Sequence, residues 1–270
     1  MAGFVSYDDL ITQITTNGFF DERFSTKVGS TMQGAGFWHR TYIAAGIPAA
    51  GSEPAATPGA AYSADASSVT FPNVSTKQRY GLSFGGVATN AITLQLHDRL
   101  VGVGGISSAS TGSKTISSAA LTRYTSGQNV QAWLEVTTAS TTTQASTHLL
   151  SYTGDVNGAA QVGAQLSWPA AATVKDCAIG PMPLAAGDTG VKACSTMNVD
   201  TANTAGVFNF VQLRPLVTIP IVASQWNERD LVLQIAALPR IFDTACLGVY
   251  MMPAAVTATT VSWQIRTAYE

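Results

Sequence analysis

Charge is what this sequence has least of. Lys and Arg together number 14 and Asp and Glu 16 in 270 residues, so charged side chains make up 11% of the chain, where about 25% is usual. The formal net charge is -2, and no basic run is present that would neutralise a series of phosphates. This argues against a nucleic-acid partner. The neutral, hydroxyl-rich surface suits either a monomer in solution or a protein packed against its neighbours.

Cysteines and long apolar runs are also scarce. The cysteines form neither an even-numbered framework nor a Cys-x-x-Cys metal clip: Cys177, Cys194 and Cys246. We predict buried free thiols, as in a protein made in a reducing cytoplasm. The N-terminus lacks the basic and apolar regions of a signal peptide, and no apolar stretch approaches the roughly 20 residues that span a bilayer. We therefore expect no export signal and no membrane partner.

The known catalytic and cofactor motifs are missing or incomplete. In GVGGISSASTGSKT, at 102–115, Ser113 interrupts the phosphate-loop pattern. Asp188, in GDTG, has the Asp-Thr-Gly of aspartic proteases, but the chain has no second copy. The histidines have no second ligand type at metal-binding spacing: His39, His97 and His148. We predict no catalytic, cofactor-binding or metal site, although a site assembled from distant residues stays open.

One segment, from about residue 7 to 16, has the pattern of a helix. Ser6 fits the N-cap, and Asp8 and Asp9 fall in the first turn, where acidic side chains complement the helix dipole. Apolar residues follow at helical spacing: Leu10, Ile11 and Ile14. We expect a short helix whose apolar side needs a partner surface.

Residues 44–68, AAGIPAAGSEPAATPGAAYSADASS, contain three prolines and almost no large apolar side chain. A segment with so little surface to bury cannot offset its own loss of conformational entropy. We predict an extended arm that becomes ordered, if at all, through contact with something else. It is either a flexible linker or an arm laid across a neighbouring subunit. Its candidate contact residues are Pro48, Pro54, Pro58 and Tyr62.

From residue 76 on, apolar and polar residues alternate as in half-buried strands. The clearest examples are AITLQLHDRL at 91–100, NVQAWLEVTT at 129–138, QVGAQLSWP at 161–169, DLVLQIAAL at 230–238 and TVSWQIRTA at 260–268. VFNFVQLRPLVTIPIV, at 207–222, is apolar on both sides and indicates a central strand, with Pro215 and Pro220 at edges or bends. The pattern predicts an all-β sandwich or barrel. We favour an antiparallel β-sandwich over 76–270, with a jelly roll as one arrangement, preceded by the helix and arm of 1–75.

In the strand at 129–138, one face is apolar and we expect it to point into the core: Val130, Ala132, Leu134 and Val136. The opposite face carries Trp133 between polar residues and is expected to be a neutral outer surface. Trp133 and Trp168 are therefore candidate contacts for a partner chain or a sugar ring. In a sandwich we expect an arm, a loop or another subunit to cover such a face.

Residues 119–163, AALTRYTSGQNVQAWLEVTTASTTTQASTHLLSYTGDVNGAAQVG, resemble a stretch that recurs in structural proteins of tailed bacteriophages and prophages. The shared features, in order, are an LTRY strand start, a strand of the QAWLEVTTA type and a hairpin of the SYT-NG type. The resemblance covers about 45 residues, and the rest of the chain is similar only in general character.

The resemblance implies a virion component, namely a capsid decoration (cement, auxiliary or minor capsid) protein that binds the major capsid protein. The alternative within the same particle is a tail or head-to-tail component. The resemblance transfers no catalytic residue, so we expect no enzyme activity and no cofactor. We expect a homo-oligomer, as a trimer, on the capsid surface after assembly in the host cytoplasm.

Two other classes of function stay open. One is a carbohydrate-binding module of a phage tail that recognises the host, for which exposed tryptophans would form the site. The other is a virion-associated hydrolase, for which Asp188 and His97 are the candidate residues.

Overall fold

The computed structural model describes residues 4–29, 34–56, 59–139, 146–168, 176–202, 205–233 and 238–270. Its α-helix, α1, spans Tyr7–Thr15 and begins as predicted, with the Ser6 hydroxyl accepting a hydrogen bond from the amide of Asp9 at 3.1 Å. Leu10 is buried and Ile14 packs against the same apolar cluster, whereas Ile11 is exposed. No helix among these residues is long and apolar enough to cross a membrane.

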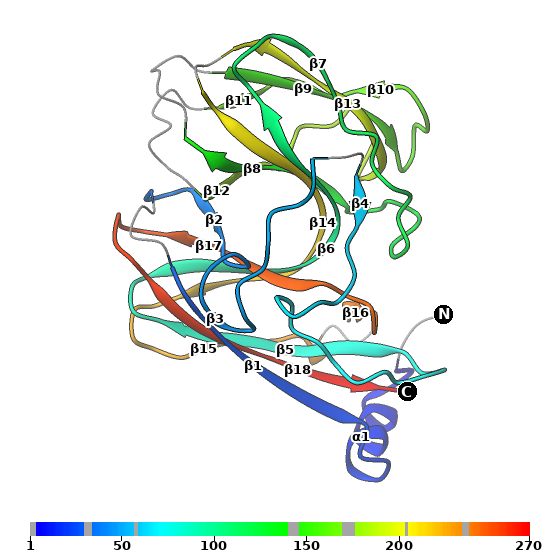
Figure 1. The fold of residues 1–270 in the computed structure, drawn as a ribbon. Coiled ribbons are helices and arrows are strands. Elements are labelled where there is room, and N and C mark those ends of the chain that lie inside the picture. The colour runs from blue at the N-terminus through cyan, green and yellow to red at the C-terminus, as the bar shows by residue number, and fades with distance from the viewer. Residues whose placement is uncertain are drawn as a thin grey trace.

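The rest of the fold consists of three antiparallel layers (Figure 1). The lower sheet has the strand order β15 (Asn227–Asp230), β5 (Arg79–Ala88), β18 (Thr260–Tyr269), β1 (Phe20–Val28) and β3 (Gly46–Ile47), with β16 (Arg240–Ile241) also beside β5. The upper sheet has the order β10 (Gln161–Val162), β9 (Ser146–Gly154), β13 (Val191–Thr201) and β7 (Gly112–Thr115), with β11 (Leu166–Trp168) beside β9.

A closed barrel lies between the two sheets. It runs through β14 (Val207–Ile221), β8 (Gln131–Thr138), β12 (Cys177–Ile179), β2 (Trp38–Arg40), β17 (Leu247–Pro253) and β6 (Ile92–Ser107), and closes because β6 also pairs with β14. The short strand β4 (Ala60–Ala61) pairs with the second half of β6. β6 and β14 are long, curved strands that connect the lower and upper parts of the molecule (Figure 1).

Most residues of the barrel strands are buried on both faces, although Thr218 and Pro220 of β14 are exposed. On β6, Leu94 and Leu96 belong to the lower core, between the barrel and the lower sheet, while His97 and Arg99 are buried on the other side. On β8, Leu134 belongs to the upper core, between the barrel and the upper sheet. In these barrel strands, two-period alternation mostly separates one buried layer from another, whereas in β1 it separates core from solvent.

The all-β antiparallel fold is confirmed, and the structure contains a closed barrel, the alternative to the favoured sandwich. The first 75 residues, expected to precede the sandwich, instead contribute β1, β2 and β4, which pair with strands of 76–270, and β3, which pairs with β1. β1 pairs with β18 along its whole length, from Phe20 with Ala268 to Val28 with Thr260. Strands from both sides of residue 75 therefore belong to the same sheets.

The prolines of the predicted central strand lie at an open edge and near a change of register, as predicted. β14 pairs with β6 along its length, but with β8 only over Val207–Leu213. Pro215 and Pro220 lie in the second half, which has one paired edge, and the pairing shifts register between Pro215 and Val217. The strand expected at 230–238 is wrong over its first part, because β15 ends at Asp230 and Leu233 is exposed.

Candidate functional site

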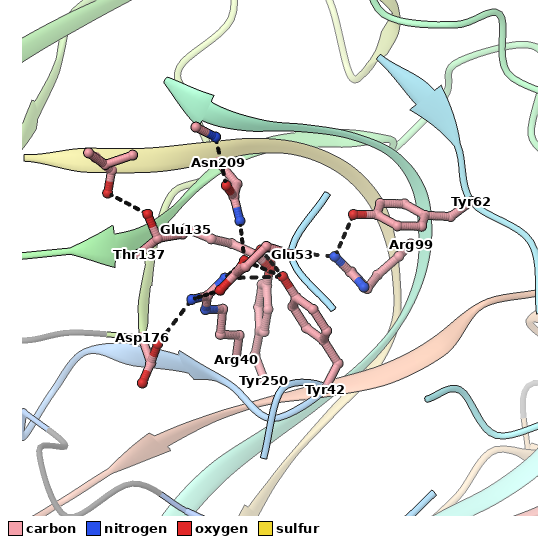
Figure 2. A network of polar contacts seen from close by, with 12 residues as sticks. Arg40, Tyr42, Glu53, Tyr62, Arg99, Glu135, Thr137, Asp176, Asn209 and Tyr250 are labelled. Carbon is pink, nitrogen blue, oxygen red and sulfur yellow. Dashed lines mark hydrogen bonds and ion pairs between the residues drawn. The ribbon is translucent and has the colours of Figure 1, made fainter. Parts of the chain in front are cut away.

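A group of buried charges lies inside the barrel around Glu135 of β8 (Figure 2). Its carboxylate accepts hydrogen bonds from the hydroxyls of Tyr42, at 2.9 Å, and Tyr250, at 2.6 Å. Nη1 of Arg40 lies 3.7 Å and Nη2 of Arg99 4.0 Å from Oε2 of Glu135. An isolated carboxylate in an apolar interior is strongly unfavourable, and these four partners compensate its charge.

Arg40 joins three parts of the chain at this centre. Its Nη1 and Nη2 donate to the two carboxylate oxygens of Glu53 at 2.5 and 2.6 Å, in a bidentate pair, and Nη2 also donates to Asp176 at 2.9 Å. Burial opposes the charge of the guanidinium, but the carboxylates of Glu135 and Glu53 outweigh it and raise the pKa of Arg40. Arg40 therefore stays charged and holds β2, β8 and the arm together.

Arg99 lies between two aromatic rings. Its guanidinium carbon is 3.5 Å from the ring centroid of Tyr42 and 4.2 Å from that of Tyr62, and its Nη2 donates to the Tyr62 hydroxyl at 2.9 Å. Cation–π contacts strengthen when water is excluded, as it is here. Burial raises the pKa of Tyr62 to about 12, so this hydroxyl stays neutral near pH 7.

The arm of residues 44–68 supplies Glu53 and Tyr62 to this centre. It is held along its path: the amide of Gly51 donates to the carbonyl of Tyr42 at 2.8 Å, and that of Gly104 to the carbonyl of Ala55 at 2.9 Å. The arm is extended and ordered by contact, as expected, but the surface it contacts is the barrel of its own chain. The described part of the arm is therefore neither a flexible linker nor dependent on a neighbouring subunit for its contacts.

The four candidate contact residues of the arm have different surroundings. The carbonyl of Pro48 accepts a hydrogen bond from Nζ of Lys27 at 2.6 Å. The carbonyl of Pro54 passes so close to Gly104 that a Cβ at that position would lie 1.9 Å from its oxygen. Tyr62 is half-buried on Arg99, and Pro58 lies outside the described residues. Contact of these residues with a partner protein stays a prediction.

The geometry of the barrel centre holds charges in place. Both hydroxyls at Glu135 point to its carboxylate, and both terminal nitrogens of Arg40 form hydrogen bonds (Figure 2).

A cavity of about 160 Å³ beside the centre is lined by His39, Arg40 and Asp176 among others, and burial lowers the pKa of His39. A cavity of this size is below the range of drug-sized ligand sites, so it suits water better than a substrate.

Trp133 lies on the opposite face of β8 from Leu134, as predicted, but that face is the barrel interior. The side chain is 1% exposed, its ring is 5.5 Å from the Tyr250 ring, and its Nε1 donates to Gln131 at 3.0 Å. The prediction of a neutral outer face on this strand is wrong, because the other strands of the barrel cover it. Trp168 ends β11, and its side chain lies outside the part of the chain that the structure describes.

Asp188 has a structural role at a turn of the upper sheet. Its carboxylate accepts hydrogen bonds from the amides of Asn157, at 2.8 Å, and Val156, at 3.1 Å, and from the hydroxyl of Tyr152 at 2.9 Å. The amide of Asn157 is the main cause that holds the pKa of this carboxyl below its usual value. The bonds fix the turn of the SYT-NG hairpin, which returns the chain from β9 to β10 with Gly158 at φ +78°.

The histidines and cysteines are buried in separate places. His97 lies inside the barrel, with its ring 4.3 Å from that of Tyr250, and burial lowers its pKa to about 3. The structure therefore does not bring His97 and Asp188 together. Among the described residues, no group of three His, Cys, Asp or Glu side chains could hold a metal ion. The thiol prediction is confirmed, because all three cysteines are free and buried: Cys177, Cys194 and Cys246.

The LTRY segment forms a turn rather than the start of a strand. Arg123 is buried, and its Nε and Nη2 donate to the two carboxylate oxygens of Asp98, each at 2.9 Å. Tyr124 has φ +51°, and the strand begins only at Gln131. The expectation of a strand at LTRY is wrong because these side chains anchor the loop to β6 instead.

Sequence reasoning missed the charged centre altogether, although a signal for it exists. Glu53 is the only charged residue between 44 and 64, and Glu135 is the only charged residue in 129–138. In a chain with so few charges, an acidic residue inside an apolar or Pro-Ala segment indicates a buried cation nearby, because an unpaired buried carboxylate is costly. That argument predicts that Glu53 and Glu135 each have a positively charged partner, but it does not identify which Arg or Lys residue that is.

Comparison with known proteins adds little to this picture. No known protein family matches the sequence, and no curated protein matches it. Among solved structures, the chain is similar to that of the infectious bursal disease virus VP2 subviral particle, with 8% identity, a TM-score of 0.19 and coverage of 96% of this chain and 85% of that chain. The chain of infectious bursal virus derived T=1 particles matches at 9% identity and a TM-score of 0.11, with 100% and 82% covered. At these scores the likeness carries no argument about function.

Proposed function

We propose that this protein is a structural component of a virus particle: a capsid decoration protein of a tailed bacteriophage. It binds the major capsid protein as a homotrimer on the outer surface of the capsid and reinforces the shell. The resemblance of residues 119–163 supports the class of particle. Many copies that each bury a modest area give strong total binding by avidity.

The observation that carries the proposal is an apolar stripe on the outer face of the lower sheet. Alternation along β1 points Phe20, Phe24 and Val28 away from the lower core, with Glu22 and Thr26 between them on the same face. Ile47 of β3 is paired with Thr26 and adds to this face. Phe24 is 61% and Ile47 71% exposed. Apolar side chains gathered on a sheet face, rather than scattered singly, are typical of a protein-binding surface.

The stripe lies on a firmly held support. β1 is paired with β18 on one side and β3 on the other. Behind β3, Nζ of Lys27 donates to the carbonyls of Ala44, Pro48 and Ala49 at 3.1, 2.6 and 3.1 Å. A surface that is ordered before binding loses little conformational entropy on docking, which favours a cementing role.

The location of the protein on purified particles tests the proposal. Antibody labelling or added density at symmetry axes of the head is the expected result. A chain found in infected-cell lysate but never in purified virions would overturn the proposal.

Substitutions on the stripe test its role. Phe24→Ser with Ile47→Ser removes two exposed apolar side chains, so it should weaken binding to heads while leaving the unfolding transition almost unchanged. Val156→Ser with Val162→Ser is the matched control, because both valines are exposed on the upper part of the molecule. Equal loss of binding in both double variants would mean that the stripe is not the interface.

A further inference from the structure

An open groove lies at the edge of the lower sheet opposite to β1 and β3. It has a volume of about 560 Å³ and lies between the second half of β14 and the segments at β15 and β16. Its lining combines aliphatic side chains with three arginines: Leu216, Leu231, Leu238, Arg214, Arg229 and Arg240. It shares no residue with the barrel centre or with the apolar stripe.

The arginines of this groove differ from most others in the chain. Five of the nine arginines form ion pairs within 4.0 Å of a carboxylate: Arg40, Arg79, Arg99, Arg123 and Arg266. Across the described residues, the four without such a pair are Arg23 and the three of the groove. In a protein this poor in charge, three uncompensated guanidiniums in one groove create a local positive field that favours an anion.

Among the described residues, no carboxylate lies within 4.0 Å of the three groove guanidiniums. Asp230, next to Arg229, accepts a hydrogen bond from the amide of Val232 at 2.7 Å. Asp243 accepts one from the amide of Val74 at 3.1 Å, and Asp98 is paired with Arg123. The guanidiniums instead contact backbone carbonyls: Arg229 donates to Thr218 at 3.4 Å, and Arg214 to Gln128. Carboxylates replace carbonyls readily as guanidinium partners, because they bind through two charged oxygens.

The aromatic side chains of the groove argue against a sugar or a nucleic acid. The guanidinium of Arg240 lies 4.3 Å from the ring centroid of Phe242, and that of Arg214 lies 5.5 Å from the ring centroid of Tyr124. The two rings also pack edge to face at 5.0 Å. These contacts take up the ring faces on which a sugar or a base would stack.

A strand edge completes the groove. β8 pairs with β14 only as far as Leu213, and no described strand continues the pairing on that edge from Arg214 to Ile221. An extended peptide that lies along this edge points alternate side chains toward opposite sides. Pro215 and Pro220 supply no amide hydrogen, so side-chain contacts in the groove carry more of the binding than a backbone ladder does. The aliphatic floor suits apolar side chains, and the arginines suit acidic ones.

We propose that this groove binds an extended, acidic peptide segment of the partner protein, with carboxylates on Arg229 and Arg240 and apolar side chains over Leu216 and Leu231. The proposal rests on the proposed function in one respect, because it assigns the segment to the protein on which this chain docks. The groove then secures a flexible part of the partner, while the apolar stripe binds its folded surface.

Fluorescence anisotropy tests the groove directly with the full chain. The probe is a short fluorescein-labelled peptide in which Glu alternates with Val, and its control has Gln in place of each Glu. We expect the Glu peptide to bind and the Gln peptide to bind about tenfold or more weakly, since each lost charge-assisted hydrogen bond weakens binding by about that factor. Equal binding of the two peptides would overturn the proposal.

Matched variants locate the binding. Arg229→Gln with Arg240→Gln should weaken binding of the Glu peptide about tenfold or more. Arg23→Gln with Lys114→Gln removes the same charge outside the groove and should change it by less than about twofold. Equal effects of the two double variants, or equally strong competition by inorganic phosphate, would show general anion attraction and overturn the proposal. Self-association of the chain that is abolished by the groove variant alone would identify a second copy as the occupant, and would also overturn it.

Binding to purified heads separates this proposal from the function on which it rests. If the chain binds heads and the groove variant binds them equally well, the groove proposal fails and the decoration role stands. If the chain does not bind heads but binds the Glu peptide through the groove, the decoration role fails and the groove remains a peptide site.

Discussion

The lower core and the barrel centre are both buried, but the lower core is stabilised by apolar packing and the barrel centre by paired charges. The lower core is a continuous layer of apolar side chains such as Phe84, Leu94 and Trp263, which the hydrophobic effect stabilises without regard to direction. The barrel centre buries Arg40, Arg99 and Glu135, and it is stable only because each charge has partners in a fixed geometry. The first depends on volume, and the second on the identity of particular groups.

This difference places the two regions at different risk from mutation. An apolar core tolerates swaps that conserve volume, at a cost below about 1.5 kcal/mol. A buried charge network fails when one member is removed, because the remaining charges stay buried without compensation. The arm of residues 44–68 depends on the second kind of interaction, since Glu53 and Tyr62 join it to the network.

The largest effect is expected for Glu135→Leu, which leaves Arg40 and Arg99 without their shared carboxylate. We expect the free energy of unfolding to fall by about 3–5 kcal/mol, as measured by urea denaturation. Glu22→Gln, which breaks the partly exposed pair with Arg266 on the lower sheet, is the control and should cost less than about 1 kcal/mol. Similar losses in the two variants would contradict the contrast between the regions.

Acidification should weaken the barrel before it affects the apolar layer. The pKa of His97 is about 3 in the folded protein and about 6.5 when unfolded. The unfolded chain therefore binds more protons than the folded protein between these two pH values. The contribution of His97 to the free energy of unfolding is fully present above about pH 6.5 and decreases as the pH falls toward 3. His97 contributes a slope of about 1.4 kcal/mol per pH unit in that window.

Urea denaturation between pH 7 and pH 4 measures this slope. His97→Phe removes the titrating group and should flatten the curve by about the contribution of one histidine. An unchanged slope in this variant would mean that other groups govern the acid response.

A smaller effect is expected for Glu53→Gln, because the Glu53 side chain is 44% exposed. The loss of charge-assisted hydrogen bonds to Arg40 should cost about 1–2 kcal/mol and loosen the arm. Hydrogen exchange at the amides of Gly51 and Tyr62 measures the loosening. Ser52→Ala, on an exposed neighbour in the arm, is the control and should leave the exchange unchanged.

The smallest effect is expected in the lower core itself. Ile265→Val removes one methylene from a side chain that is 2% exposed, so it should cost about 1 kcal/mol with no change in the pH dependence. Thermal denaturation is sufficient to detect it. A cost comparable with that of Glu135→Leu would mean that this layer is packed as specifically as the charged centre.

Much of the local structure follows from the sequence. The helix at Tyr7–Thr15 was predictable because its cap, its first-turn acids and its apolar spacing agree. The alternation in β6, β8 and β18 predicted strands, since period-two patterns depend only on neighbours along the chain. The DLVLQIAAL stretch shows the limit, because its alternation continues past Asp230, where the strand ends.

The candidate site was much less predictable. Pro48, Pro54 and Tyr62 contact their own chain in the structure, a packing that the sequence does not reveal, and their contact with a partner stays a prediction. Trp133 is correctly predicted to lie on the face opposite Leu134, but a single strand does not show whether that face meets water, an arm or other strands. The arginine groove was missed since Arg214, Arg229 and Arg240 are brought together only by the fold.

The sequence by itself determined that this chain is all-β, poor in charge and equipped with a Pro-Ala-rich arm, because composition and periodicity are local properties. The tertiary structure alone decided that six strands close into a barrel, that the arm lies on that barrel, and that Glu135 shares its carboxylate with Arg40 and Arg99. These pairings join residues far apart in the chain. No local pattern specifies which strand covers which face, or which of the few charges will meet.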